Sequence, residues 1–281
     1  MQVLSFPPYG YCSGVANAFA LARKAREEHP RETIYLVGSL VHNEVGMKPL
    51  LEDGFILLDE ANGPLEKQME GLKEGSIILF SAHGHSEKAY RKVVDEKRFT
   101  VYDATCPFVQ RNIDIILEGK KTAFIGNPNH LEAIAIRNEP NVAIIDPSHP
   151  VVEGKFDRFL VQTSLDEEEM EKAEALLKEK NPDIENCLGR CPSSILRQKN
   201  VIAAPKDVDL IIVVGSKSSA NSKRLASLAK KTHPSATVWQ VLDEKELAGK
   251  DLSSYQKAAL FSGASSSEAA FQAVREYLTK I

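Results

Sequence analysis

The sequence predicts an α/β protein with mostly parallel sheets, organised as three small domains. Short apolar runs alternate with longer amphipathic stretches along the chain, and this alternation is typical of repeated strand–helix–strand units. The chain has 281 residues, which is enough for two or three domains of ordinary size. Three of its four cysteines, Cys12, Cys106 and Cys191, recur at intervals of about 90 residues, so that one stands in each α/β unit.

The predicted strands are apolar runs bounded by glycine, proline, serine or asparagine. They cover residues 2–6, 33–37, 76–80, 100–103, 122–125, 142–145, 159–162, 210–214, 237–241 and 258–261. The most distinct predicted helices cover residues 15–28, 165–180, 222–231 and 267–280. In the second of these the acidic run 166–169 complements the helix N-terminus. The expected domains are residues 13–106, residues 107–191, and residues 192–281 together with the N-terminal strand in 1–12.

Composition and charge exclude several classes of protein. The apolar fraction is 43% and the charged fraction 26%, as in globular proteins. No apolar run approaches the ~18–20 residues that span a bilayer, and the first residues carry no secretory signal pattern. The net charge is -4, which does not favour nucleic acid as a partner. We therefore expect a cytoplasmic protein that binds neither membranes nor nucleic acid.

Five of the predicted strands run into loops rich in small and polar residues. These loops cover residues 81–84, 126–130, 162–164, 215–221 and 262–267. Ligands of parallel sheets bind outside the carboxyl ends of the strands, and hydroxyl, amide and helix N-terminal N–H groups suit a phosphate or diphosphate. Ordinary helix capping by serine and asparagine is the alternative for each loop. The glycine signatures of nucleotide-binding loops are not found in the sequence.

Three cysteines stand where helices are expected to begin. Cys106 and Cys191 are each followed by proline, which favours the first helical position, and Cys12 precedes an alanine-rich helical stretch. The positive end of a helix dipole favours a thiolate, the form that binds metal. Three such thiolates suit a zinc site, or an iron–sulfur cluster with one position not held by cysteine. Separate buried thiols remain the alternative, and Cys187 has no comparable context.

Histidines and one acid add to this candidate constellation. His42, His83 and His130 lie in predicted loops after strands, while His85 ranks below them. Glu132 follows His130 by two residues. A carboxyl in a closed, partly apolar pocket can have its pKa raised toward neutrality, as general acid catalysis requires.

Taken in chain order from residue 10 to residue 265, the motifs of this sequence resemble those of the 4-hydroxy-3-methylbut-2-enyl diphosphate reductase family, also called LytB or IspH. The motifs are Gly10-Tyr11-Cys12-Ser13-Gly14-Val15, Leu40-Val41-His42-Asn43, Ser81-Ala82-His83-Gly84, Asp103-Ala104-Thr105-Cys106-Pro107, His130-x-Glu132, Gln162-Thr163-Ser164-Leu165, Cys191 with Arg197-Gln198, Gly215-Ser216-Lys217-Ser218-Ser219-Ala220-Asn221-Ser222 and Gly263-Ala264-Ser265. Together they cover nearly the whole chain.

The resemblance implies a trefoil of three α/β domains around a central iron–sulfur cluster. It also implies reductive removal of the allylic hydroxyl of (E)-4-hydroxy-3-methylbut-2-enyl diphosphate, which yields isopentenyl and dimethylallyl diphosphate at the end of the non-mevalonate (MEP) isoprenoid pathway. The implied cofactor is one 4Fe–4S cluster, which can also be isolated as 3Fe–4S. An external donor such as flavodoxin or ferredoxin would supply the electrons.

The resemblance also implies a role for each site residue. The implied cluster ligands are Cys12, Cys106 and Cys191. The implied catalytic residues are Glu132 as the proton-relay acid, with Thr163 and His130 near the reacting hydroxyl. The implied substrate and diphosphate ligands are His42, His83, His130, Ser219, Asn221 and Ser265.

The sequence departs from the family pattern near the expected pocket. The departures are Tyr9, Asn127, Leu131, Ala135, Ile136 and Ala220, together with the additional Cys187. They leave open a divergent relative that uses the same iron–sulfur site on a different allylic or phosphorylated substrate. A non-catalytic phosphate-binding protein with incidental thiols is a third hypothesis.

Overall fold

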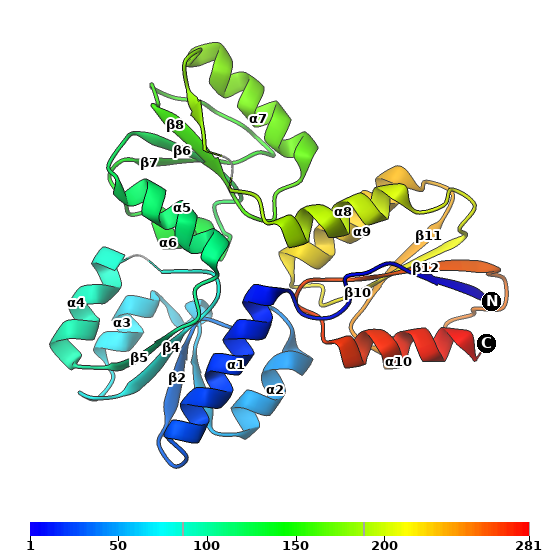
Figure 1. The fold of residues 1–281 in the computed structure, drawn as a ribbon, viewed down its shortest axis with the longest axis horizontal. Helices are drawn as coiled ribbons and strands as arrows, with labels where there is room; N and C mark the ends of the chain where they lie inside the picture. The colour runs from blue at the N-terminus through cyan, green and yellow to red at the C-terminus, as the bar shows by residue number, and fades with distance from the viewer. Residues whose placement is uncertain (86, 188, 281) are drawn as a thin grey trace. The chain divides into compact units, whose positions relative to one another are not determined.

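Over the residues that the structure describes, the strands form three four-stranded sheets, and helices pack against them (Figure 1). A computed structural model describes residues 1–85, 87–187 and 189–280. Every strand pair in the described residues is parallel. The predicted α/β class with parallel sheets is therefore confirmed.

The chain divides into two compact units. Unit 1 comprises residues 1–16, 41–52 and 192–281, and unit 2 comprises residues 17–40 and 53–191. Unit 1 holds one sheet and unit 2 holds the other two. The division into three domains with the boundaries expected above stays a prediction.

The sheet of unit 1 is covered by helices on both faces. Its strand order is β1 (Gln2–Ser5), β12 (Lys257–Ser262), β10 (Leu210–Val214) and β11 (Thr237–Val241). One core, with side chains from β10, contains residues of α8 (Pro192–Ala203) and α9 (Ala220–Thr232), and the other contains residues of α10 (Glu268–Thr279). Because both faces are covered, the central strand β10 is apolar and buried along its whole length. Unit 1 also contains α2 (Glu44–Glu52), the 3-10 helix η2 (Glu244–Leu247) and the first turn of α1 (Ser13–Glu28), up to Ala16.

The first sheet of unit 2 has the order β3 (Phe55–Leu58), β2 (Ile34–Val37), β4 (Ile77–Phe80) and β5 (Thr100–Asp103). Residues of α3 (Leu65–Glu70) and α4 (Glu87–Lys97) pack against side chains of this sheet. The helix α1 (Ser13–Glu28) buries an alanine stripe at Ala18, Ala22 and Ala25, which is the spacing of one helical face. The short 3-10 helix η1 (Glu60–Asn62) precedes α3.

The second sheet of unit 2 has the order β7 (Val142–Ile145), β6 (Thr122–Ile125), β8 (Arg158–Val161) and β9 (Glu185–Asn186). Side chains of α5 (Pro107–Leu117) and α6 (Leu131–Ile136) form one of its cores, and those of α7 (Glu167–Lys180) form the other. Asp166 caps α7 by accepting the Glu169 N–H, as the acidic run predicts.

All ten predicted strands are present, with each end within one residue of its predicted position. The four predicted helices are also present, with ends within two residues. Two strands were not predicted. β3 is apolar and follows Gly54, so its signal was available in the sequence, whereas β9 consists of Glu185 and Asn186 and carries no apolar pattern.

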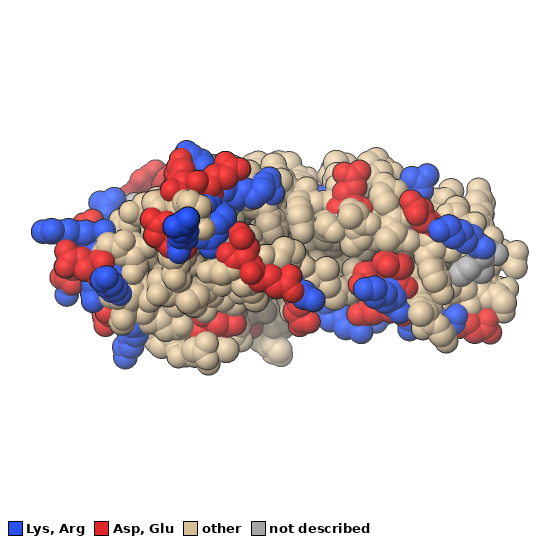
Figure 2. All heavy atoms as spheres, turned by 90° about the horizontal axis from the view of Figure 1, so that it is seen from below, with Lys and Arg blue, Asp and Glu red and all other residues tan. Residues whose placement is uncertain are grey.

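The helices and one face of the surface show how apolar and charged residues are distributed. In the described part of the chain, no helix combines the length and the hydropathy needed to cross a membrane. On the face shown in Figure 2, basic and acidic side chains of the described residues are intermingled, and no large patch of one sign stands out. This face therefore lacks the basic stripe that nucleic-acid binding favours.

Candidate functional site

Polar loops after β10 and β12 lie side by side in unit 1. Ser219 is the N-cap of α9 and also accepts a hydrogen bond from the Ser265 hydroxyl, with an Oγ–Oγ distance of 3.0 Å. The carboxamide oxygen of Asn221 accepts the Ala264 N–H at 3.0 Å. All three predicted diphosphate ligands of these loops, Ser219, Asn221 and Ser265, are therefore brought together. Helix capping, the ordinary alternative for this loop, is also present, because Ser219 caps α9 while its hydroxyl contacts Ser265.

The loop before α2 contacts the same group of polar residues in unit 1. The carboxamide of Asn43 donates to the Ser265 carbonyl at 3.1 Å, and the Ser218 hydroxyl donates to the His42 carbonyl at 3.1 Å. His42 is thus held beside the serine-rich loop of β10, and its role as a diphosphate ligand stays a prediction. The sequence motif contained Asn43 but gave no sign that its side chain would connect these loops.

Two glycines allow α9 to approach the sheet closely. A Cβ atom placed on Gly215 or Gly263 would lie 2.2 Å or 2.1 Å from the Ser222 hydroxyl oxygen. Ser222 is fully buried and its hydroxyl has no hydrogen-bond partner within the described residues. Only glycine at both positions leaves room for Ser222, and this brings the N-terminus of α9 to the strand ends.

Unit 2 contains a buried carboxyl that contacts a threonine. Glu132 is 6% exposed and accepts two hydrogen bonds from Thr163, one from the backbone N–H at 2.9 Å and one from the hydroxyl at 2.6 Å. Burial raises the pKa of Glu132 to about 7, against the opposing effect of the two Thr163 hydrogen bonds. A carboxyl that keeps its proton near neutral pH is suited to act as a general acid.

Two histidines lie near this pair. His130 is the N-cap of α6, and its Nδ1 accepts the Glu132 N–H at 3.2 Å. In the neutral ring the proton is therefore on Nε2. The rings of His83 and His130 have centroids 6.2 Å apart, and Ser81 contacts Nδ1 of His83 at 3.3 Å. Unit 2 thus brings together His83, His130, Glu132 and Thr163.

A left-handed turn fixes the direction of the chain after His83. Gly84 has a φ of 80°, which is strained for residues with a side chain. A Cβ atom at this position would also lie 2.8 Å from the Ile113 side chain. Glycine is therefore required here for the His83 loop to pack against α5.

The three predicted cysteine ligands share one backbone arrangement. Each directly precedes a helix, namely α1, α5 and α8, as predicted. The N–H groups of Cys12, Cys106 and Cys191 donate to the carbonyls of Ala264, Ala82 and Thr163, at 3.0, 3.0 and 2.9 Å. Each of these carbonyls lies in a loop that follows a strand end. The sequence could not predict this pairing, because the partners are far apart along the chain.

Cys187 has a different environment. It follows β9, and its N–H donates to the Phe159 carbonyl. Burial, followed by the nearby Glu185 carboxylate, raises the pKa of the Cys187 thiol. Such a thiol resists forming the thiolate that binds metal.

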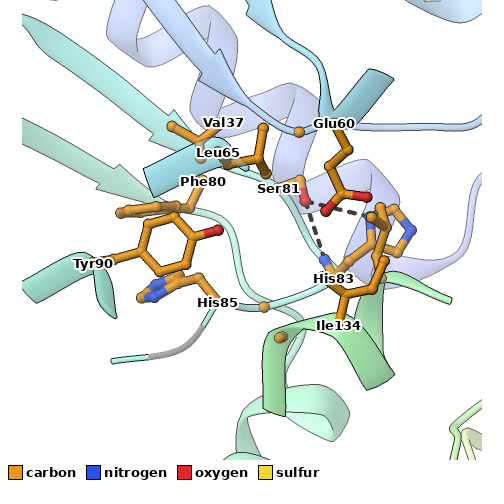
Figure 3. A pocket seen from close by; sticks show the side chains of 13 residues that line it. Val37, Glu60, Leu65, Phe80, Ser81, His83, His85, Tyr90 and Ile134 are labelled. Atoms are coloured by element: carbon orange, nitrogen blue, oxygen red, sulfur yellow. Dashed lines mark hydrogen bonds between the residues drawn. The ribbon is translucent and has the colours of Figure 1, made fainter. Parts of the chain in front are cut away.

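A pocket in unit 2 opens beside His83. Its polar lining residues are Glu60, Ser81, His83, His85 and Tyr90. Figure 3 shows His85 and Tyr90 on one side of the pocket and Glu60, Ser81 and His83 on the other. Burial raises the pKa of Glu60. His85 also contacts Asp103 at 3.3 Å, and Asp103 accepts two hydrogen bonds from Thr105 beside Cys106.

The predicted residues thus fall into two groups. Unit 1 holds His42, Ser219, Asn221 and Ser265 with Cys12, and unit 2 holds His83, His130, Glu132 and Thr163 with Cys106 and Cys191. Over the described residues, no three His, Cys, Asp or Glu side chains form a group that could hold a metal ion. The assignment of three cysteines to one cluster therefore remains a proposal based on their donor chemistry.

A family model for the LytB protein matches residues 3–279. The chain belongs to the LytB family. A Malacoplasma penetrans relative is 31% identical over 262 residues, which are 88% of this chain and 87% of the relative. A Buchnera aphidicola relative is 32% identical over 298 residues, which are 100% of this chain and 89% of the relative. Both are named 4-hydroxy-3-methylbut-2-enyl diphosphate reductase.

Two solved structures are similar to this chain. The E-1-hydroxy-2-methyl-but-2-enyl-4-diphosphate reductase from Plasmodium falciparum has a TM-score of 0.85 and 27% identity, covering 99% of this chain and 88% of that chain. A second structure, described as (E)-4-hydroxy-3-methyl-but-2-enyl diphosphate reductase, has a TM-score of 0.66 and 22% identity over the full length of both chains. This second similarity shows the fold alone.

The positions that depart from the LytB pattern have separate structural roles. Tyr9 stacks on Phe271 in the core of unit 1, with ring centroids 4.4 Å apart. Asn127 is exposed and caps the following turn, and Ile136 is buried in a core of unit 2. Ala220 is the first residue of α9. Only Leu131 and Ala135 line the pocket beside His83.

Proposed function

We propose that this chain is a 4-hydroxy-3-methylbut-2-enyl diphosphate reductase. The reaction takes up two electrons and two protons, breaks the allylic C–O bond, forms a C–H bond and releases water. The products are isopentenyl and dimethylallyl diphosphate. The observation that carries the proposal is the buried Glu132–Thr163 pair, together with family membership over residues 3–279.

The polar cluster of unit 1 would bind the diphosphate. The hydroxyls of Ser219 and Ser265 are hydrogen-bonded to each other, and Asn221 is hydrogen-bonded to Ala264, the residue before Ser265. His42 is held beside them. Hydroxyl, amide and imidazole donors form charge-assisted hydrogen bonds to phosphate oxygens. We assign His83 and His130 as further substrate ligands in unit 2.

Glu132 and Thr163 would deliver a proton to the leaving oxygen. A hydroxyl both donates and accepts hydrogen bonds. Glu132 can therefore pass its proton to the Thr163 oxygen while the Thr163 hydroxyl proton moves to the substrate oxygen, which then leaves as water. The raised pKa of Glu132, about 7, keeps this proton in place near neutral pH.

Three cysteines would hold the iron–sulfur cluster. Thiolate donors at the start of helices suit iron–sulfur clusters, and Cys12, Cys106 and Cys191 all have this position. We assign them as ligands of one 4Fe–4S cluster, recoverable also as 3Fe–4S. When bound, the cluster supplies electrons and a Lewis-acidic iron. An external donor such as flavodoxin or ferredoxin, and a cytoplasmic location, stay predictions.

Anaerobic purification and a turnover assay test the proposal. We expect about 4 iron atoms per chain and turnover of (E)-4-hydroxy-3-methylbut-2-enyl diphosphate with a chemical reductant. A protein that binds no iron under these conditions would contradict the cluster assignment. A protein with a full cluster and no turnover would instead favour the second candidate below.

The second candidate is a relative that reduces another allylic diphosphate. The observation that favours it is that Leu131 and Ala135, both departures from the family pattern, line the pocket beside His83. Competition between the proposed substrate and other allylic diphosphates, measured as kcat/KM ratios, distinguishes the two candidates.

A further inference from the structure

Arg197 is a buried arginine of α8 that joins separate segments of unit 1. Its side chain is 3% exposed. Nε donates to the Ser262 carbonyl at 3.0 Å, Nη2 donates to the Gly10 carbonyl at 2.9 Å, and Nη1 donates to the Ser193 carbonyl at 3.4 Å. A buried guanidinium is costly unless its N–H groups are bonded. These charge-assisted bonds therefore hold the three carbonyls firmly in place.

The partners of Arg197 adjoin two proposed cluster ligands and one proposed diphosphate loop. Gly10 lies two residues before Cys12, and α8 begins directly after Cys191. Ser262 ends β12 and opens the segment 262–265. One side chain thus contacts all three regions through backbone carbonyls.

We call Arg197 and its three carbonyl partners the Arg197 clamp. Ala264 connects this clamp to the proposed diphosphate ligands. The Ala264 carbonyl accepts the Cys12 N–H at 3.0 Å, and the Ala264 N–H donates to Asn221 at 3.0 Å. The next residue is Ser265, whose hydroxyl contacts Ser219. The backbone of Cys12 is therefore hydrogen-bonded to the same short segment, 264–265, that contacts Asn221 and contains Ser265.

We infer that Arg197 is a positioning residue that locks the Cys12 segment onto the segment 262–265. This inference rests on the proposed function, because Cys12 and Ser265 are its assigned ligands. Arg197 then fixes the position both of Cys12 and of the segment that would bind a diphosphate through Asn221 and Ser265. Lysine at position 197 would keep the charge but would lack the planar fork that reaches Gly10 and Ser262 at once.

Hydrogen exchange of the Cys12 and Ala264 amides tests the clamp directly, with and without cluster. In Arg197→Lys and Arg197→Met, both amides should exchange about tenfold faster than in the unaltered protein, because loss of one charge-assisted hydrogen bond allows local opening. Unchanged exchange at both amides in both variants would overturn the inference. Exchange that is fast only in Arg197→Met would show that charge alone matters, which also overturns the positioning role.

Arg158→Met is the matched control. Arg158 is 2% exposed and also bonds to neighbouring groups, including Glu118 and Thr122, but it lies on β8 in unit 2. The Arg158→Met substitution should lower overall stability without selectively accelerating hydrogen exchange of the Cys12 amide. If Arg158→Met accelerates exchange at Cys12 as strongly as Arg197→Met does, the effect is general destabilisation and the inference is wrong.

Two further measurements separate this inference from the proposed function. Iron loss to a chelator from reconstituted protein should be about tenfold faster in both Arg197 variants than in the unaltered protein. Inorganic pyrophosphate should slow exchange of the Cys12 amide in the unaltered protein and do so less in Arg197→Met. If the unaltered protein takes up no cluster and binds no pyrophosphate, the proposed function fails, and the exchange rates still decide whether Arg197 holds the segment. If the unaltered protein takes up the cluster and binds pyrophosphate, and the Arg197 variants show the same exchange and iron-loss rates as the unaltered protein, only the inference fails.

Discussion

Replacing Glu132 with glutamine should abolish a specific pH dependence of stability. In the folded protein burial raises the pKa of Glu132 to about 7, from an ordinary value of 4.5. The native state therefore keeps this proton at pH values where the unfolded chain has lost it. The contribution to stability is fully present below pH 4.5 and is lost as pH rises through about 7.

The magnitude follows from the two pKa values. Between pH 5 and pH 8 the free energy of the unfolded chain falls by roughly 2–3 kcal/mol relative to that of the native state, because Glu132 ionises more readily in the unfolded chain. Glutamine retains the shape and can still bond to both Thr163 groups once the threonine hydroxyl rotates to accept. The difference in unfolding free energy between Glu132→Gln and the unaltered protein should therefore shift by roughly 2–3 kcal/mol in favour of the variant over this range.

Urea unfolding of the cluster-free protein at pH 5 and pH 8 measures this shift. Glu171→Gln on the exposed face of α7 is the control, and it should show no such change. A Glu132→Gln difference that is equal at both pH values would refute the claim that Glu132 holds its proton near neutrality. The same variant with a full cluster should turn over at ~1% of the normal rate or less; near-normal turnover would remove Glu132 from the proton relay.

The remaining predictions concern packing, binding and ligation. Gly263→Ala should destabilise unit 1 by ~1–3 kcal/mol in thermal unfolding through its clash with the Ser222 hydroxyl, and adding Ser222→Ala should restore most of the loss; no rescue would mean that the clash lies elsewhere. Asn221→Ala should weaken pyrophosphate binding about tenfold by calorimetry, and unchanged affinity would exclude Asn221 from the site. Cys191→Ser should lose iron and turnover while Cys187→Ser keeps both; the reverse result in an iron assay would reassign the third ligand.

The sequence by itself predicted ten of the strands, four of the helices and the local position of most candidate residues. Apolar runs such as residues 210–214 identify strands because helices cover both faces of the sheet. Proline after Cys106 and after Cys191 identifies helix starts, because a helix needs no N–H at its first position. Polar residues beyond strand ends predict the ligand-binding edge, because parallel strands end at the same edge of a sheet. These signals are local, so a single sequence carries them.

Only the tertiary structure decided which of these residues meet. Glu132 contacts Thr163 across 31 residues of chain, and the pKa of Glu132 depends on burial that the sequence does not specify. Tyr9, a departure from the family pattern, packs in a core against Phe271. Arg197 reaches Gly10 from the far end of the sequence, 187 residues away. Such contacts depend on how sheets and helices pack, and packing is a property of the whole chain, so residue type and spacing alone did not predict them.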